Sequence, residues 1–137
     1  HVILTPHPYR DKNFHTVRQA AAGLREAGIV PKICLPFEVD RSFDLPKDLR
    51  FHRLDRELPN AELVICFGGD GTILHMAKAA TRAGLPLLGV VPEDDELPLS
   101  LHHGIPLLLR TNYNAAAAYK NIARRMQGQR TPLLRIR

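Results

Sequence analysis

The chain has 137 residues, of which 45% are hydrophobic, and this length and composition predict one folded domain with a real core. Its 19 Lys and Arg against 14 Asp and Glu give a formal net charge of +5, spread along the chain, so nucleic-acid binding is disfavoured. No apolar run approaches the roughly 18 residues of a membrane span and no signal peptide is visible, so we expect a cytoplasmic protein without a membrane partner.

The cysteines and histidines do not have the spacing of metal ligands. Cys34 and Cys66 fall in predicted strands, so we expect buried free thiols rather than a disulfide or a CxxC metal site. His102 and His103 are adjacent, and on a strand they would point to opposite faces. We therefore predict no metal site, and the sequence gives no prediction of an oligomeric state.

The first half of the chain predicts strands around one long helix. Pro6 and Pro8 end the first strand, because proline fixes φ and excludes helix. Apolar residues at helical spacing then follow Asn13, the expected N-cap, and Gly28 is the expected stop. The predicted elements are a strand at 2–4, a helix at 14–27, a strand at 32–35 and an edge strand at 49–54.

The second half continues the alternation, with a continuously apolar run at 63–67 that is typical of a parallel strand covered on both faces. The expected elements after it are a helix from Thr72 to near Gly84, strands at 87–91 and 105–109, and a helix at 114–127. The pattern predicts an α/β fold: a single three-layer, Rossmann-like domain with a mainly parallel sheet of about five to six strands and about three helices.

A glycine turn follows the run at 63–67, and it is the strongest functional signal. Gly68, Gly69 and Gly71 lack side chains, so backbone N–H groups can approach a ligand and φ can become positive. The helix that opens near Thr72 directs its positive dipole end to the same place. This pattern predicts phosphate binding at the turn.

Asp70, inside the turn, is unusual because a carboxylate repels phosphate unless a metal intervenes or the acid accepts a proton from an attacking hydroxyl. The alternative is structural, since an Asp in a glycine-rich turn often caps the following helix. The string Gly-Gly-Asp-Gly-Thr at 68–72, directly after a strand, resembles the signature of the NAD kinase family. The resemblance extends back to residues 5–12 and forward to Gly89-Val90, and so covers about residues 1–90.

From Gly89 onward the chain resembles a different family. Members of the NAD kinase family continue with a long β-rich domain, whereas residues 89–134 resemble the closing segment of the septum-site-determining Min-type ATPases, which have a deviant Walker P-loop. That resemblance implies that Pro92, Glu93 and Asp94 lie against the adenine of ATP, with residues 91–137 supplying a closing strand and helix. The alternative is that 92–96 is an acidic surface loop. No P-loop sequence is present.

Two origins are open, a natural short paralogue and an engineered chimera, and we expect the chimera. Three functions are also open. The resemblance implies transfer of the ATP γ-phosphoryl group to the 2′-hydroxyl of NAD with Mg²⁺, Asp70 being catalytic and Gly68, Gly69, Gly71 and Thr72 holding phosphate. The other two are a phosphate or nucleotide-binding module and an inert scaffold. We expect a scaffold that requires no cofactor, with at most weak nucleotide binding and no turnover.

Overall fold

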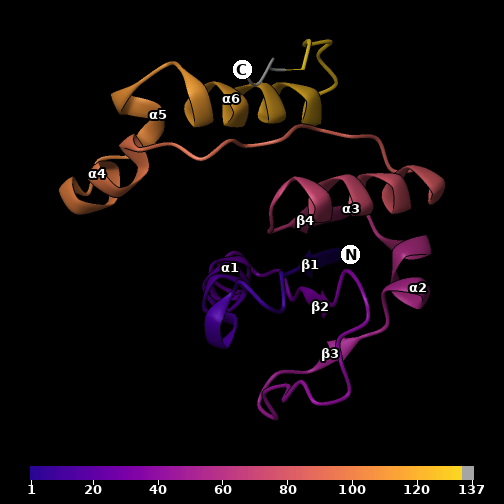
Figure 1. Ribbon diagram of the computed structural model, residues 1–137. Coiled ribbons are helices and arrows are strands. Elements are labelled where there is room, and N and C mark those ends of the chain that lie inside the picture. The colour runs from indigo at the N-terminus through magenta and orange to yellow at the C-terminus, as the bar shows by residue number, and fades with distance from the viewer. Residues whose placement is uncertain (134–137) are drawn as a thin grey trace. The chain divides into compact units, whose positions relative to one another are not determined.

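The computed structural model describes residues 1–133, which divide between Leu87 and Leu88 into two units (Figure 1). The first unit contains a sheet whose four strands are all parallel, in the order β3-β2-β1-β4. Its elements are β1 (Val2–Thr5), the 3₁₀ turn η1 (Lys12–Phe14), α1 (His15–Glu26), β2 (Lys32–Cys34), β3 (Phe51–His52), α2 (Leu54–Glu57), the 3₁₀ turn η2 (Leu58–Asn60), β4 (Leu63–Cys66) and α3 (Asp70–Arg82). The α/β prediction with a parallel sheet is confirmed.

Helices cover both faces of this sheet because successive residues of a strand point to opposite sides. Leu4 of β1 packs with Val17 and Ala21 of α1 in one buried cluster. Its neighbour Ile3 packs on the other face with Cys34 and Leu58, and side chains of α3 adjoin that cluster. Both Ile3 and Leu4 are fully buried, which accounts for the continuous apolar character of the central strands.

Two predicted strands are absent from the described residues, so the sheet has four strands rather than five to six. Residues 87–91 have no regular secondary structure and pair with no strand among the described residues. The Arg125 guanidinium donates a hydrogen bond to the Leu88 carbonyl, and a Cβ added at Gly89 would lie 2.7 Å from Ile122 Cγ1. This stretch therefore packs on a helix of its own unit, and its carbonyl bonds to a side chain instead of a sheet neighbour.

The second unit is helical over its described residues. It contains α4 (Glu96–His103), α5 (Leu107–Arg110) and α6 (Asn114–Met126). The strand predicted at 105–109 is wrong, because Leu107 begins α5 directly after Pro106; a short apolar run does not distinguish a buried strand from a helical turn. The predicted helix at 114–127 is confirmed, as are those at 14–27 and 72–84 within two residues at each end.

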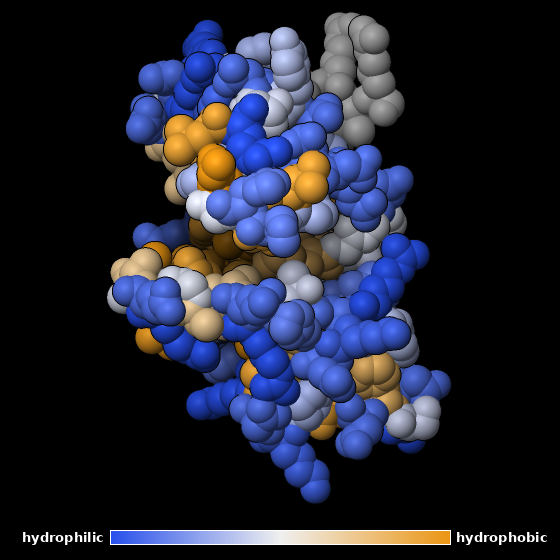
Figure 2. All heavy atoms as spheres, turned by 90° about the vertical axis from the view of Figure 1, so that its left-hand side faces the viewer, coloured by the Kyte–Doolittle hydropathy of each residue, from blue (hydrophilic) through white to orange (hydrophobic). Residues whose placement is uncertain are grey.

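The second unit has a small core, formed by Leu107, Ala115 and Ala116 with Val91 against them. Many of its larger apolar side chains are exposed, among them Leu101 at 75% and Leu109 at 78%. Figure 2 shows hydrophobic residues interrupting the hydrophilic surface in the region of α4 and α5. One leucine and small alanines therefore make up the buried core of this unit.

Aspartates from outside the helices close the N-termini of α1, α4 and α6. The predicted cap Asn13 does not serve this role for α1; instead, Asp11 accepts hydrogen bonds from the amides of Thr16 at 2.9 Å and Val17 at 3.1 Å. Asn13 has a φ of 53° and lies in the turn that precedes the helix. The carboxylate thus satisfies amides that have no partner within the helix.

The two cysteines are free thiols in different surroundings. Cys34 is buried, and burial raises the pKa of its thiol to about 11, while Cys66 is only half-buried. Burial also raises the pKa of the Cys66 thiol. In the part of the chain that the structure describes, no three or more His, Cys, Asp and Glu side chains are arranged to hold a metal ion, and no helix is long and apolar enough to cross a membrane.

Replacing Asp11 with Ala is expected to lower the free energy of unfolding by about 1 kcal/mol, because two amides of α1 lose their acceptor. Asp11→Asn should cost less, since one side-chain oxygen remains. Urea denaturation followed by circular dichroism measures the difference. Asp44→Ala, at an exposed position of the same unit, is the control. Equal stabilities for Asp11→Ala and the wild type would show that this cap is unimportant.

Candidate functional site

The glycine turn lies where the order of the sheet reverses. From β1 the chain moves through α1 to β2 on one side, whereas β4 pairs with the other side of β1. In open α/β sheets, ligands bind outside the carboxyl ends of the strands at such a reversal. Thr5 at the end of β1 is in register with Cys66 at the end of β4. The loop at 6–12 and the turn at 67–69 therefore leave the sheet from the same edge.

The three glycines meet different requirements. A Cβ at Gly68 would lie 2.9 Å from Cβ of Thr72, which is buried, so this glycine allows the turn to pack on the first turn of α3. A Cβ at Gly69 would lie 2.8 Å from Nη1 of Arg10, whereas Gly71 has open space. None of the three has a positive φ, so close approach, and not a left-handed backbone, explains Gly68 and Gly69.

The N-terminus of α3 differs from those of the other long helices. No side chain among residues 1–133 accepts a hydrogen bond from the amides of Asp70, Gly71 or Thr72. These N–H groups lack helical partners, and the helix dipole adds positive potential there. Asp70 is exposed and makes no hydrogen bond or ion pair with the described residues, so it does not cap its own helix. The arrangement provides free donors for an anion.

Arg10 brings a cation to the turn, and the sequence analysis did not single it out. It belongs to the loop after β1, and its guanidinium lies against the backbone of Gly69. Arg10 is exposed and forms no ion pair within residues 1–133, so its donors are available. The sequence signal for Arg10 was its position in the loop, five residues after the end of the first strand, because loops after adjacent parallel strands share an edge of the sheet.

Asp94 has a structural role in the second unit. Its carboxylate accepts a hydrogen bond from the Glu96 amide at 3.0 Å and from the Ala115 amide at 3.1 Å, and so holds the N-termini of α4 and α6 together. Pro92 is half-buried and Glu93 is exposed beside it. The predicted contact of Pro92, Glu93 and Asp94 with adenine remains a prediction.

The site is thus an uncapped helix N-terminus with two closely packed glycines and an arginine, at the switch point of a parallel α/β sheet. Comparisons with curated proteins find similarity to NAD kinases. The chain is 36% identical to the NAD kinase of Corynebacterium efficiens over 92 residues, which cover 65% of this chain and 29% of that protein. It is 35% identical to the NAD kinase of Mycobacterium tuberculosis over 99 residues, covering 65% of this chain and 32% of the relative.

A second similarity involves another protein. Over 64 residues, the chain is 34% identical to the septum site-determining protein MinD of Bacillus subtilis, covering 47% of this chain and 24% of MinD. The 65% of this chain that matches the NAD kinase and the 47% that matches MinD together exceed the length of the chain, so the two matched stretches overlap. The chain spans less than a third of the length of these relatives. No protein-family model and no solved structure matches it.

Gly68→Ala is expected to destabilise the fold by about 1 to 3 kcal/mol, since the added methyl group would overlap the buried Thr72 side chain. Gly71→Ala should leave the stability unchanged or slightly raised, because nothing lies within 4 Å of the added Cβ and alanine favours helix. Thermal unfolding of both variants tests this. A Gly71→Ala variant that is the less stable of the two would contradict the packing described here.

Proposed function

We propose that the turn at 68–72 binds a phosphate group of a nucleotide, ATP or NAD, and that the 137-residue chain does so without turnover. We place this binding in the cytoplasm, where both nucleotides occur. The observation that carries the proposal is the convergence of the Arg10 guanidinium and the free amides of α3 on one turn. Backbone N–H groups at a helix N-terminus and a guanidinium both donate strong hydrogen bonds to phosphate oxygens.

The similarity to NAD kinases supports a nucleotide as the source of that phosphate. Gly68, Gly69, Gly71 and Thr72 would form the cradle, although the buried Thr72 side chain faces Gly68 and so acts by shaping the turn. Its hydroxyl lies 3.1 Å from the Cβ position of Gly68. In this proposal, ligand contacts come from backbone amides and from Arg10.

Asp70 places an exposed carboxylate beside the proposed phosphate site. A single exposed carboxylate fits Mg²⁺, which usually takes one or two carboxylates together with substrate phosphates instead of an all-protein cage. When bound, Mg²⁺ would neutralise phosphate charge. Without it, Asp70 repels the ligand; with a hydroxyl substrate nearby, Asp70 could instead accept its proton.

We also infer that the chain was recombined from two nucleotide-binding ancestors. The chain is similar both to NAD kinases and to MinD, and the division of the fold between Leu87 and Leu88 lies close to the Gly89-Val90 junction predicted from the motifs. In this interpretation, the first unit derives from the kinase-like ancestor, and Pro92, Glu93 and Asp94 are a remnant of an adenine loop. The sequence motifs on either side of Gly89-Val90 and the division of the fold support this recombination.

The second candidate function is phosphoryl transfer itself, from ATP to the 2′-hydroxyl of NAD, with Asp70 as the base. The motif at 68–72 and the kinase similarity favour it. Binding and transfer are separable, because transfer also requires that a second substrate be held in line with the first.

Replacing Asp70 with Asn is expected to tighten binding of metal-free ATP several-fold at low ionic strength. Repulsion between unit charges at about 4 Å is roughly 1 kcal/mol in water and larger near a protein surface, and 1.4 kcal/mol is about tenfold in affinity. High salt should reduce the gain. Calorimetry and amide shift titration measure it. Asp44→Asn, which removes the same charge at an exposed position, should bind like the wild type.

Arg10→Gln should weaken the same binding, because the site loses its cation. If neither the wild type nor Asp70→Asn gives saturable shifts at residues 68–74, the turn does not bind phosphate and the chain is a scaffold.

The chain incubated with ATP, Mg²⁺ and NAD is expected to form no NADP above a protein-free blank. It spans less than a third of the NAD kinases that it resembles, and positioning of two substrates can supply about 7 to 11 kcal/mol of barrier reduction. A coupled NADP-specific dehydrogenase assay reports the product. NADP formation that Asp70→Asn abolishes, and Asp44→Asn does not, would establish transfer as the function.

A further inference from the structure

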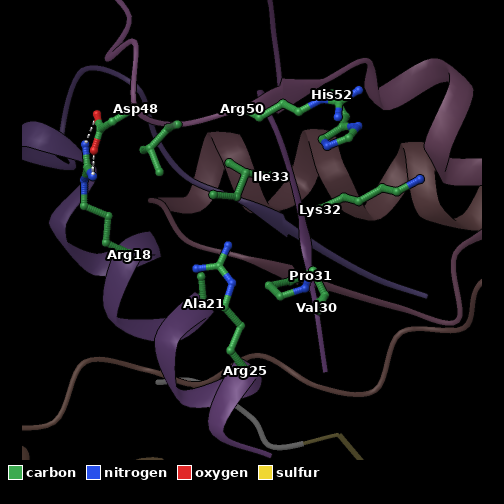
Figure 3. A pocket seen from close by; sticks show the side chains of 11 residues that line it. Arg18, Ala21, Arg25, Val30, Pro31, Lys32, Ile33, Asp48, Arg50 and His52 are labelled. Atoms are coloured by element: carbon green, nitrogen blue, oxygen red, sulfur yellow. Dashed lines mark hydrogen bonds and ion pairs between the residues drawn. The ribbon is translucent and has the colours of Figure 1, made fainter. Parts of the chain in front are cut away.

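A cavity lined by cations lies in the first unit between α1 and the strands β2 and β3 (Figure 3). Its volume is about 800 Å³, within the range of roughly 300 to 1,000 Å³ that is typical of small-molecule sites. Residues 30–31 and 49–50, which precede β2 and β3, form part of its wall. Because the strands are parallel, these residues lie at the edge of the sheet opposite to the glycine turn. The cavity is therefore separate from the site described above.

Two arginines in this cavity have no acidic partner. Arg18 is neutralised by Asp48, with Nη2 and Oδ1 3.0 Å apart, and Nζ of Lys32 lies 2.7 Å from a Glu57 oxygen. Arg25 and Arg50 form no ion pair with any residue from 1 to 133. In Figure 3 the Arg25 side chain projects from α1 into the cavity toward Ile33. The lining therefore carries uncompensated positive charge.

The wall between the cations is apolar. Ala21, Pro31 and Ile33 form its buried floor, and the apolar side chains that remain accessible are Val30, which is 77% exposed, and the half-buried Leu49. A purely inorganic anion would use the arginines and leave this surface uncovered. A ligand with a planar or aliphatic body would cover it while its anionic groups reach the rim.

A solvated helix face explains only part of this arrangement. Arg25 is in the last turn of α1, where a cation complements the helix dipole. Arg50 comes from the segment before β3 and Lys32 from β2, so the cations that line the cavity belong to three separate elements. Guanidinium groups match phosphate oxygens in geometry and are less strongly hydrated than ammonium groups.

We propose that this cavity is a second binding site, for a small phosphorylated molecule that carries at least two phosphate charges on a planar or apolar body. Arg25 and Arg50 would bind the phosphates, and the accessible apolar surface of Val30 and Leu49 would contact the body. The site lies at the far edge of the sheet from Asp70 and does not depend on phosphate binding at the glycine turn.

The test uses the full chain with ADP and pyrophosphate as probes at low ionic strength, followed by amide shift titration. ADP is expected to shift the amide signals of residues 18–25, 30–33 and 48–52 saturably. It should also bind more tightly than pyrophosphate, because only ADP carries an adenosine group that can contact the apolar wall. The double variant Arg25→Gln/Arg50→Gln should weaken this binding about tenfold or more. The matched control is Arg41→Gln/Arg82→Gln, which removes two exposed charges outside the cavity and should bind like the wild type.

The response at the cavity should persist in Arg10→Gln, which distinguishes it from binding at residues 68–74. Shifts confined to 68–74 would overturn the cavity proposal and leave the turn proposal intact. Equal ADP affinity in Arg25→Gln/Arg50→Gln and the wild type would also overturn it. A mixed-sequence single-stranded oligonucleotide that displaces ADP and binds more tightly would identify a nucleic-acid surface and reject the small-molecule assignment.

Discussion

The pairing of β1 with β4 is the interaction on which the candidate site depends. Four residue pairs hold the strands in parallel register, from Val2 with Leu63 to Thr5 with Cys66, and the Phe67 amide extends the ladder to the Thr5 carbonyl at 2.9 Å. A parallel ladder requires both chains to leave at the same edge. Arg10 can therefore lie against Gly69, although the two residues are far apart in sequence. A slip of one residue in this register would turn Ile3 and Leu4 to the wrong faces of the sheet.

The chain uses carboxylates in two opposite ways. Asp11 closes α1, and Asp94 closes both α4 and α6, by accepting hydrogen bonds from amides at the helix starts. The amides bonded to these two carboxylates are therefore not available to a ligand. Asp70 occupies the first turn of α3 yet accepts no such bond, and the amides beside it stay free. The same side-chain chemistry thus closes three of the four helices of eight or more residues and leaves the N-terminus of α3 open, which is why we propose that a ligand binds at α3.

Sequence reasoning located the elements whose signals are local and missed those that depend on neighbours. The helix at 14–27 and the strand at 63–67 were predictable because periodicity and continuous apolar character specify them directly. The strand predicted at 87–91 is not formed, because Gly89 packs against Ile122 of α6. No local sequence pattern encodes that contact, so it could not be predicted. The glycine turn could be predicted, whereas Arg10 could not, since its place at the turn follows from strand order.

β4 is also an outer strand of the sheet. It pairs with β1 on one side, and no strand within residues 1–133 pairs with its other side. Its four residues, Leu63 to Cys66, are apolar and all half-buried, without a charge or proline to discourage pairing. Such an edge is a template for β-augmentation and for aggregation. A strand added there by another polypeptide would lie directly beside the glycine turn, so self-association at high concentration would restrict access to that turn.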